Sequence, residues 1–200
     1  MISRHTFRFA LLLMSVFVLG ACSKEQPASY VATDISGASY AHDFQLTDHN
    51  GKARTLADFR GKVVAIFFGY THCPDVCPTT LSDFAMAMKR LGKDAEKVQV
   101  IFVTVDPERD TRALLAQYVP AFHPSFLGMY TTPAMTQALA REFKLFYQKQ
   151  PIDKRGRYAV DHSAGTYIYD PQGRVRLYMA YGQGPEAIAH DIAQLLNNAS

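Results

Sequence analysis

The chain has 200 residues, of which 48% are hydrophobic and 20% charged, and its formal net charge is +3. This composition excludes a disordered chain, which carries fewer apolar residues and a larger net charge. The three cysteines are too few for a disulfide-rich scaffold, and no Lys/Arg cluster of the kind that binds nucleic acid is present. Because three is an odd number, at least one cysteine must have a fate other than an intrachain disulfide.

The first 21 residues have the pattern of a secretory signal. Arg4 and Arg8 give a basic start, and an apolar run of twelve residues follows from 9 to 20. Twelve helical residues span about 18 Å, less than the ~30 Å hydrocarbon core of a bilayer. We therefore predict a cleaved signal peptide rather than a permanent transmembrane helix.

Small residues stand immediately before Cys22, as in the bacterial lipoprotein signal, where the cysteine is lipidated and becomes the first residue. The alternative is an ordinary signal peptide that leaves Cys22 as a stray thiol. We predict a signal peptide at 1–21, a lipidated N-terminus and flexible tether at 22–40, and one folded domain at 41–200. The domain is then expected on the periplasmic side of a bacterial membrane, held by its lipid anchor.

Beyond the tether, the hydrophobic pattern predicts strands that alternate with helices. Residues 44–47 followed by Asn50-Gly51 predict an N-terminal β-hairpin. The other predicted strands cover 63–68, 98–105, 165–169 and 175–178, and the predicted helices cover 78–91, 110–118, 132–143 and 185–196. This order predicts an α/β fold with a central mixed sheet flanked by helices.

Cys73 and Cys77 lie between a predicted buried strand and a predicted helix. A helix N-terminus stabilises thiolates, and a spacing of four residues places both side chains on one helical face. The pair suits a structural disulfide, a redox-active dithiol or a soft metal ion, and the spacing leaves these three open. Zinc and iron–sulfur clusters require four ligands, whereas Cu(I) accepts fewer and prefers sulfur.

Three segments together resemble the Sco/SenC family. They read Gly-Tyr-Thr-His-Cys-Pro-Asp-Val-Cys-Pro at 69–78, Thr-Val-Asp-Pro-Glu-Arg-Asp-Thr at 104–111 and Asp-His-Ser at 161–163. The resemblance extends over about residues 44–196. It implies a thioredoxin-like fold and a membrane-tethered copper protein that helps to assemble the dinuclear copper centre of cytochrome c oxidase.

The resemblance also implies a ligand set. Cys73, Cys77 and His162 would bind one copper ion per monomer, with Cu(I) as the expected form and Cu(II) as a second form. Asp161 is expected to orient the imidazole, since metal-bound histidines usually have such a partner, and Asp106 to lie at the same sheet edge. Each of these two aspartates could instead stabilise its own loop.

Other candidate ligands are expected to lie outside the site. His72 points elsewhere if its segment is extended. Met86 and Met88 cannot share a helix face at a spacing of two residues, so we expect them in the core or partly exposed. The remaining histidines of the domain are expected in loops or at the surface, namely His42, His49, His123 and His190.

Two functions follow from the resemblance. The first is a copper chaperone whose partner is the copper-site subunit of cytochrome c oxidase, which would place the chain at the inner membrane. The alternative is a thiol–disulfide oxidoreductase with a redox-active disulfide between Cys73 and Cys77, whose thiolates His162 would tune. Other periplasmic copper chaperones and thiol reductants are further expected partners. A third possibility, protection from peroxide, lacks the Thr-x-x-x-Cys pattern of peroxidases, because Thr71 stands only two residues before Cys73.

Overall fold

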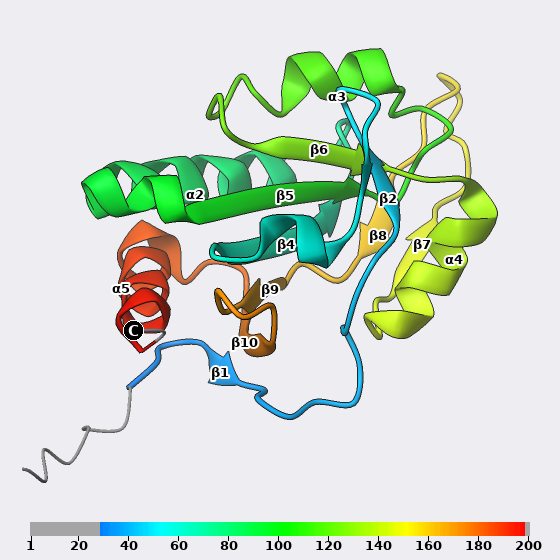
Figure 1. Cartoon of the computed structure of the whole chain (residues 1–200). Helices are drawn as coiled ribbons and strands as arrows, with labels where there is room; N and C mark the ends of the chain where they lie inside the picture. The colour runs from blue at the N-terminus through cyan, green and yellow to red at the C-terminus, as the bar shows by residue number, and fades with distance from the viewer. Residues whose placement is uncertain (1–28, 199–200) are drawn as a thin grey trace, which may run out of the picture.

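A computed structural model describes residues 29–198, and eight of their strands form one mixed sheet (Figure 1). The order of the strands across this sheet is β1-β10-β9-β4-β5-β6-β2-β3. Their bounds are β1 Thr33–Asp34, β2 Leu46–Asp48, β3 Ala53–Arg54, β4 Val63–Gly69, β5 Val98–Thr104, β6 Leu127–Tyr130, β9 Thr166–Tyr169 and β10 Val175–Met179. A separate two-stranded sheet pairs β7 (Tyr147–Lys149) with β8 (Val160–His162).

Strands β4, β5 and β6 run parallel at the centre, and the strands on both sides of them are antiparallel. Every residue of β4 and β5 is buried. Such mostly apolar strands are typical of a sheet that is covered on both faces. The carboxyl ends of parallel strands share one edge, so the loops after β4 and β5 lie together.

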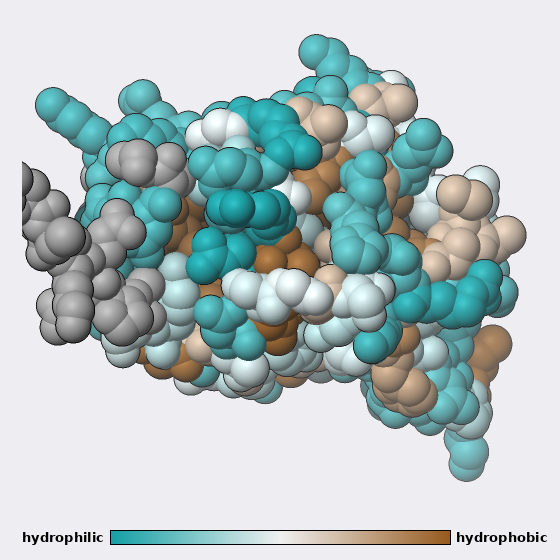
Figure 2. All heavy atoms as spheres, turned by 60° about the horizontal axis from the view of Figure 1, so that its bottom comes forward, coloured by the Kyte–Doolittle hydropathy of each residue, from teal (hydrophilic) through white to brown (hydrophobic). Residues whose placement is uncertain are grey.

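Helices cover both faces of this sheet (Figure 1). Their bounds are α2 Val76–Leu91, α3 Arg112–Tyr118, α4 Pro133–Glu142 and α5 Gly184–Asn197, with 3₁₀ helices η1 Leu56–Phe59 and η2 Gly92–Lys97. One apolar cluster joins α2, α3 and α5 to the first face, and a second joins η1 and the end of α4 to the other. Hydrophilic residues cover most of the molecular face seen in Figure 2, with smaller hydrophobic areas between them.

The start of the folded domain differs from the sequence prediction. The backbone N–H groups of Val31 and Ala32 donate to the buried Asp191 carboxylate at 2.9 and 2.8 Å. Strand β1 then pairs with β10. These contacts fix residues from 31 onward, so the predicted tether does not extend to residue 40. The predicted signal peptide and Cys22 lie outside the described residues.

Most of the predicted elements are present. The N-terminal hairpin is confirmed as β2 paired with β3, and Thr111 and Thr132 cap α3 and α4. The prediction did not include β1, β6, β7 or β8, which have two to four residues each. Such short strands carry too little periodicity to be recognised without their partners. Within the residues described, no helix is long and apolar enough to cross a membrane.

Candidate metal centre

The two cysteines lie where the chain passes from β4 into α2. The loop after β4 turns with the Cys73 N–H donating to the Tyr70 carbonyl at 3.2 Å. Helix α2 begins at Val76, two residues before the predicted start at Pro78. Pro78 fits there because the first turn of a helix does not use its N–H groups for intrahelical bonds. Cys77 therefore lies inside the first turn.

The Cys73 sulfur caps this helix. The Cys77 N–H lies 3.5 Å from Cys73 Sγ, whereas the Asp75 side chain at the N-cap position makes no capping bond. An anionic acceptor at a helix N-terminus is favoured both by the free N–H groups and by the helix dipole. Cys73 is partly exposed and Cys77 is fully buried, so one sulfur faces the outside and the other the core.

His162 completes the cluster from the end of β8. Its Nε2 lies 3.6 Å from Cys77 Sγ, and its Nδ1 lies 3.0 Å from the Ser163 carbonyl oxygen. The Tyr70 ring packs edge-on against the imidazole, with ring centroids 5.8 Å apart and planes at 90°. One ligand atom from each of Cys73, Cys77 and His162 lies within 4.8 Å of the others.

The two thiols have opposite acid–base properties. The pKa of Cys73 is lowered to about 5, chiefly by a hydrogen bond from the Cys77 thiol, with smaller contributions from backbone N–H groups and His162. The pKa of Cys77 is raised by the same bond with Cys73 and by burial. The pair therefore holds its first negative charge on the more exposed sulfur, which is the one that an incoming partner can reach.

Gly69, the last residue of β4, leaves the space that the Cys77 sulfur occupies. A Cβ atom at this position would lie 2.5 Å from Cys77 Sγ and 2.8 Å from the Phe102 ring. Real Cβ atoms essentially never approach other atoms so closely. The local sequence pattern does not predict this requirement for glycine, because it arises from a neighbour eight positions along the chain.

A buried aspartate holds the loop that leads to Cys73. Asp110 is 1% exposed and accepts hydrogen bonds from the Thr71 N–H at 2.9 Å, the Thr71 hydroxyl at 2.6 Å and the Thr104 hydroxyl at 2.6 Å. It thereby ties the loop after β4 to the end of β5. Asp110 belongs to the 104–111 segment of the resemblance, but its role is visible only in the folded chain.

The two aspartates expected around the site make other contacts. Asp161 Oδ2 accepts from Gln150 Nε2 at 2.6 Å, and the Ser163 carbonyl lies against His162 Nδ1 in its place. Asp106 is buried and bonded to Arg109 and to the Tyr158 hydroxyl. Asp106 holds the guanidinium of Arg109, which lies 5.6 Å from the centre of the Tyr70 ring. Neither carboxylate belongs to the three-residue cluster.

The remaining expectations have mixed outcomes. His72 is exposed and its Nδ1 lies 3.1 Å from the Thr71 hydroxyl, away from the cluster. Met88 is buried and Met86 is 47% exposed, which matches the expected packing roles. The prediction that His49 lies at the surface is wrong, because this residue is buried. Its ring tolerates burial since Nδ1 accepts a hydrogen bond from the Gly128 N–H at 3.0 Å.

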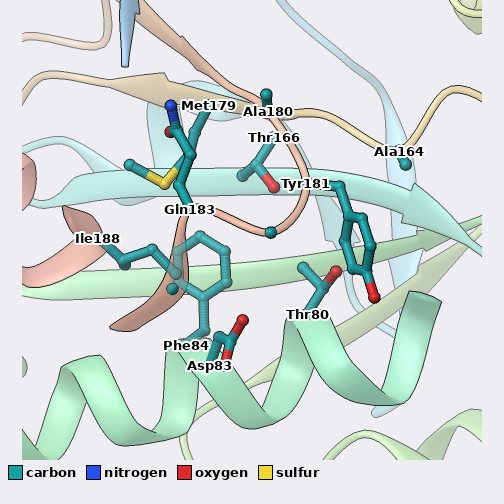
Figure 3. Close-up of a pocket in the computed structure, with 12 residues that line it drawn as sticks. Thr80, Asp83, Phe84, Ala164, Thr166, Met179, Ala180, Tyr181, Gln183 and Ile188 are labelled. Carbon is teal, nitrogen blue, oxygen red and sulfur yellow. The ribbon is translucent and has the colours of Figure 1, made fainter. Parts of the chain in front are cut away.

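A separate small cavity lies between α2 and the connection from β10 to α5 (Figure 3). Asp83 faces it from α2, and Gln183 faces it from the other side. Burial and the nearby Glu186 raise the pKa of Asp83. The cavity has a volume of about 20 Å³, which suits one water molecule. None of Cys73, Cys77 and His162 lines this cavity.

Comparison with known proteins identifies the family of the chain. Residues 32–197 match the family described as SCO1/SenC. The chain belongs to this family. Among SCO1/SenC relatives, the bovine mitochondrial SCO2 homologue is 39% identical over 152 residues, which are 75% of this chain and 57% of that protein. A SCO2-like protein of Rickettsia felis is 33% identical over 73% of this chain and 72% of its own length.

Solved Sco structures have the same fold. The Bradyrhizobium japonicum ScoI structure with copper bound is 42% identical, covers 76% of this chain and 97% of its own, and has a TM-score of 0.70. Yeast Sco1 with copper bound is 28% identical, covers 83% of this chain and 88% of its own, and has a TM-score of 0.68. These neighbours confirm the thioredoxin-like fold with its mixed central sheet.

The donor atoms of the cluster fit copper. Two sulfurs and one imidazole nitrogen form a soft set of three donors, and Cu(I) accepts such a set. Tetrahedral zinc would require a fourth ligand, and no further His, Cys, Asp or Glu joins the cluster among residues 29–198. The arrangement can therefore bind a soft monovalent ion or exchange a disulfide.

Proposed function

We propose that the chain is a membrane-tethered copper chaperone that delivers copper to the dinuclear copper site of cytochrome c oxidase. Copper is its cargo, and one ion per monomer would be held by Cys73, Cys77 and His162. The observation that carries this proposal is the meeting of these three donors within 4.8 Å. The copper-bound structures of two relatives support the same assignment.

The geometry suits transfer as well as binding. Release of copper by ligand exchange requires that at least one donor be reachable from outside, so that an incoming thiolate replaces the donors one at a time. Cys73 is that donor, because it is partly exposed and its pKa of about 5 makes it a thiolate at neutral pH. Cys77 and His162 would hold the ion while the Cys73 bond is exchanged. Both cysteines must be reduced because only a thiolate binds the ion, and no electron moves during the exchange.

Metal titration tests the ligand assignment. The reduced chain should bind one equivalent of Cu(I) in competition with a chelator, and His162→Ala should weaken this binding. Asp161→Ala is the matched control, since its carboxylate is bonded to Gln150 and does not belong to the cluster. Stoichiometric binding that is unaffected by His162→Ala would refute the assignment of this histidine.

The second candidate function is a thiol–disulfide oxidoreductase. A low-pKa, partly exposed thiol paired with a buried one is the arrangement that disulfide exchange uses. The Cys73 thiolate would attack a disulfide of a partner, and Cys77 would then release the reduced partner by closing the Cys73–Cys77 disulfide. Two electrons pass to the partner, which leaves this chain oxidised until a thiol reductant restores it.

Two genetic observations test the candidates. A Cys73→Ser variant that retained full activity would exclude disulfide exchange, because no other described thiol is accessible, and it would equally contradict the role of Cys73 as the exchanging copper donor. Excess copper given to a strain that lacks the protein is the more informative test. Recovery of oxidase activity would favour copper supply, and failure to recover would favour reduction of the oxidase thiols.

The proposed membrane location depends on Cys22, which lies outside the described residues. We expect the mature protein to start at a lipidated Cys22 on the periplasmic side of the inner membrane, where the oxidase is assembled. Mass spectrometry of the N-terminal peptide should find the lipid on Cys22, and Cys22→Ser should move the protein from the membrane to the soluble fraction. An unmodified Cys22 in membrane-bound protein would contradict this expectation.

A further inference from the structure

An open groove lies beside the more exposed thiol. One wall is formed by residues on both sides of Cys73, namely Tyr70, His72 and Pro74, and the other by the loop that joins β7 to β8. Arg109 lies between the walls, with its guanidinium 3.5 Å from the centre of the Tyr158 ring and 5.6 Å from that of Tyr70. The groove has a volume of about 760 Å³, which is enough for several side chains.

The loop side of the groove has a net positive charge. Residues 149–157 contain four basic side chains and one acidic one, so their net charge is +3. Lys149 is paired with Glu108, and Arg157 with Asp153. Lys154 and Arg155 are exposed on the same loop, between the lining residues Asp153 and Gly156, and have no ion-pair partner among the described residues. Opposite charge on a partner would therefore meet two cations that are free to pair.

Two further residues of this region are relevant to what the groove could bind. Ile152 is 69% exposed on the same loop and forms its apolar tip. Arg109 donates from Nε to Asp106 and from Nη1 to the Tyr158 carbonyl, while Nη2 is buried without an acceptor among the described residues. An unpaired guanidinium N–H is unfavourable, so a carboxylate or carbonyl oxygen would be bound strongly at Nη2 once the atoms that cover this nitrogen had moved aside.

We propose that this groove receives an extended acidic segment of the protein that exchanges copper or electrons with Cys73. The inference rests on the proposed function, because the groove opens beside the thiol at which the exchange would occur. Asp153 is the acidic residue that lines it, and its carboxylate is paired with Arg157. An acidic segment would thus be attracted along the loop side and would place its own ligand or thiol next to Cys73.

An anionic membrane surface would also attract a basic loop with an apolar tip. The observations favour a protein segment, because the cations border a concave groove that a flat bilayer cannot enter. A bilayer against this loop would also cover Cys73, the donor that the proposed transfer needs to expose. A protein segment and a membrane can be distinguished in one experiment, because an acidic peptide represents the first and lipid vesicles the second.

The test uses the purified full chain in its reduced state and a fluorescein-labelled acidic peptide, Glu-Glu-Gly-Tyr-Gly-Glu-Glu. Fluorescence anisotropy at low salt should detect binding, and the bound peptide should slow alkylation of Cys73 by iodoacetamide. Lys154→Glu/Arg155→Glu should weaken peptide binding at least about fivefold, as two lost charge pairs predict. The control Lys89→Glu/Lys93→Glu makes the same charge change at the far end of α2 and the start of η2 and should alter the affinity less than about twofold.

The outcomes are separable. Equal loss in the two double variants, no binding by the unchanged chain, or unchanged alkylation of Cys73 would each overturn the proposal. Vesicles of equal parts phosphatidylglycerol and phosphatidylcholine that bind through Lys154 and Arg155, with no binding of the peptide, would show a lipid contact and also overturn it. Cu(I) affinity is measured for every variant and should not change. If the unchanged chain bound no Cu(I), the proposed function would be refuted, but the proposed peptide-binding groove would not.

Discussion

The backbone of Gly69 lies against the sulfur of Cys77, at a separation that would leave 2.5 Å between Sγ and a Cβ atom on residue 69. This contact connects the end of a central strand to the buried thiol of the cluster. The contact fixes the position of the Cys77 sulfur in the core, and it explains why β4 ends in a residue without a side chain.

Gly69→Ala should therefore disturb both stability and metal binding. Overpacking of a filled core costs about 1–3 kcal/mol of the free energy of unfolding, and we expect a loss in that range. Displacement of the Cys77 sulfur should also weaken Cu(I) binding. Urea denaturation and chelator competition measure the two effects.

A double-mutant cycle with Cys77→Ala identifies the cause. Removal of the sulfur relieves its clash with the new methyl group, so Gly69→Ala should cost clearly less stability in the Cys77→Ala background. The contact with Phe102 at 2.8 Å remains in both backgrounds and accounts for the residual loss. Equal costs in the two backgrounds would show that the sulfur is not the atom displaced.

The reactivity of Cys73 should follow its lowered pKa. Alkylation of the reduced chain by iodoacetamide should rise with a midpoint near pH 5, since the pKa of Cys73 is about 5. Because the Cys77 thiol makes the largest contribution to that shift, Cys77→Ala should move the midpoint upward, toward the ordinary pKa of a thiol. A midpoint near 8 in the unchanged chain would contradict the proposed bond between the two sulfurs.

The same shift predicts how stability depends on pH. Between about pH 5 and 8 the folded Cys73 has lost its proton, while the unfolded thiol still holds one, so the unfolded state binds more protons. The contribution of Cys73 to stability should therefore be present at pH 8 and fall as the pH drops toward 5. The difference in free energy of unfolding between the reduced chain and Cys73→Ser should shrink over this range, and a constant difference would argue against the shift.

Asp110→Asn should weaken the site through the loop that Asp110 holds. The amide replaces one acceptor oxygen by a donor, which would face the N–H or hydroxyl groups of Thr71 and Thr104. The expected loss is about 1–3 kcal/mol of stability, with weaker Cu(I) binding because Thr71 stands two residues before Cys73.

Asp191→Asn is the matched control for this variant. Asp191 is also fully buried and accepts two backbone N–H bonds, but these come from Val31 and Ala32 at the start of the domain. It should lose stability and keep its Cu(I) affinity. If both variants bound Cu(I) as the unchanged chain does, Asp110 would have a role in stability alone.

Arg109→Lys should loosen the loop between β7 and β8. An ammonium group cannot reproduce the guanidinium bonds to Asp106 and the Tyr158 carbonyl while stacking on the Tyr158 ring. The Gln150 N–H, which donates to the Ala159 carbonyl at 2.9 Å inside the loop, should then exchange with deuterium about tenfold faster.

Arg112→Lys provides the comparison. Arg112 makes similar bonds to the carbonyls of His49 and Asn50, in the turn between β2 and β3. Its replacement should increase exchange near that turn and leave Gln150 unchanged. Faster exchange of Gln150 in both variants would indicate a general loss of stability.

The sequence was informative wherever the signal is local. The apolar residues at 63–68 and 98–105 predicted β4 and β5, the Asn50-Gly51 turn predicted the hairpin, and Pro78 marked the first turn of α2 to within two residues. The cysteine spacing identified the reactive pair but left three uses open. The family resemblance added His162, which spacing alone does not connect to the cysteines.

The sequence was misleading where a polar residue is paired by distant parts of the chain. His49 stands immediately before the Asn50-Gly51 turn and was expected at the surface, yet the Gly128 N–H donates to its ring inside the protein. Asp161 stands next to His162 in the sequence, but adjacent residues of a strand point to opposite faces, so its carboxylate contacts Gln150 instead.

The amino-acid sequence by itself thus determined the central strands, the helix that follows Cys73 and the choice of the two thiols, because each depends on neighbours within a few residues. The tertiary structure decided the rest. It places His162 against Cys77 across 85 positions, Asp110 against Thr71 across 39, and Gly69 under the buried sulfur. Folding alone brings these groups together, and their contacts set the depth, charge and accessibility of the two sulfurs.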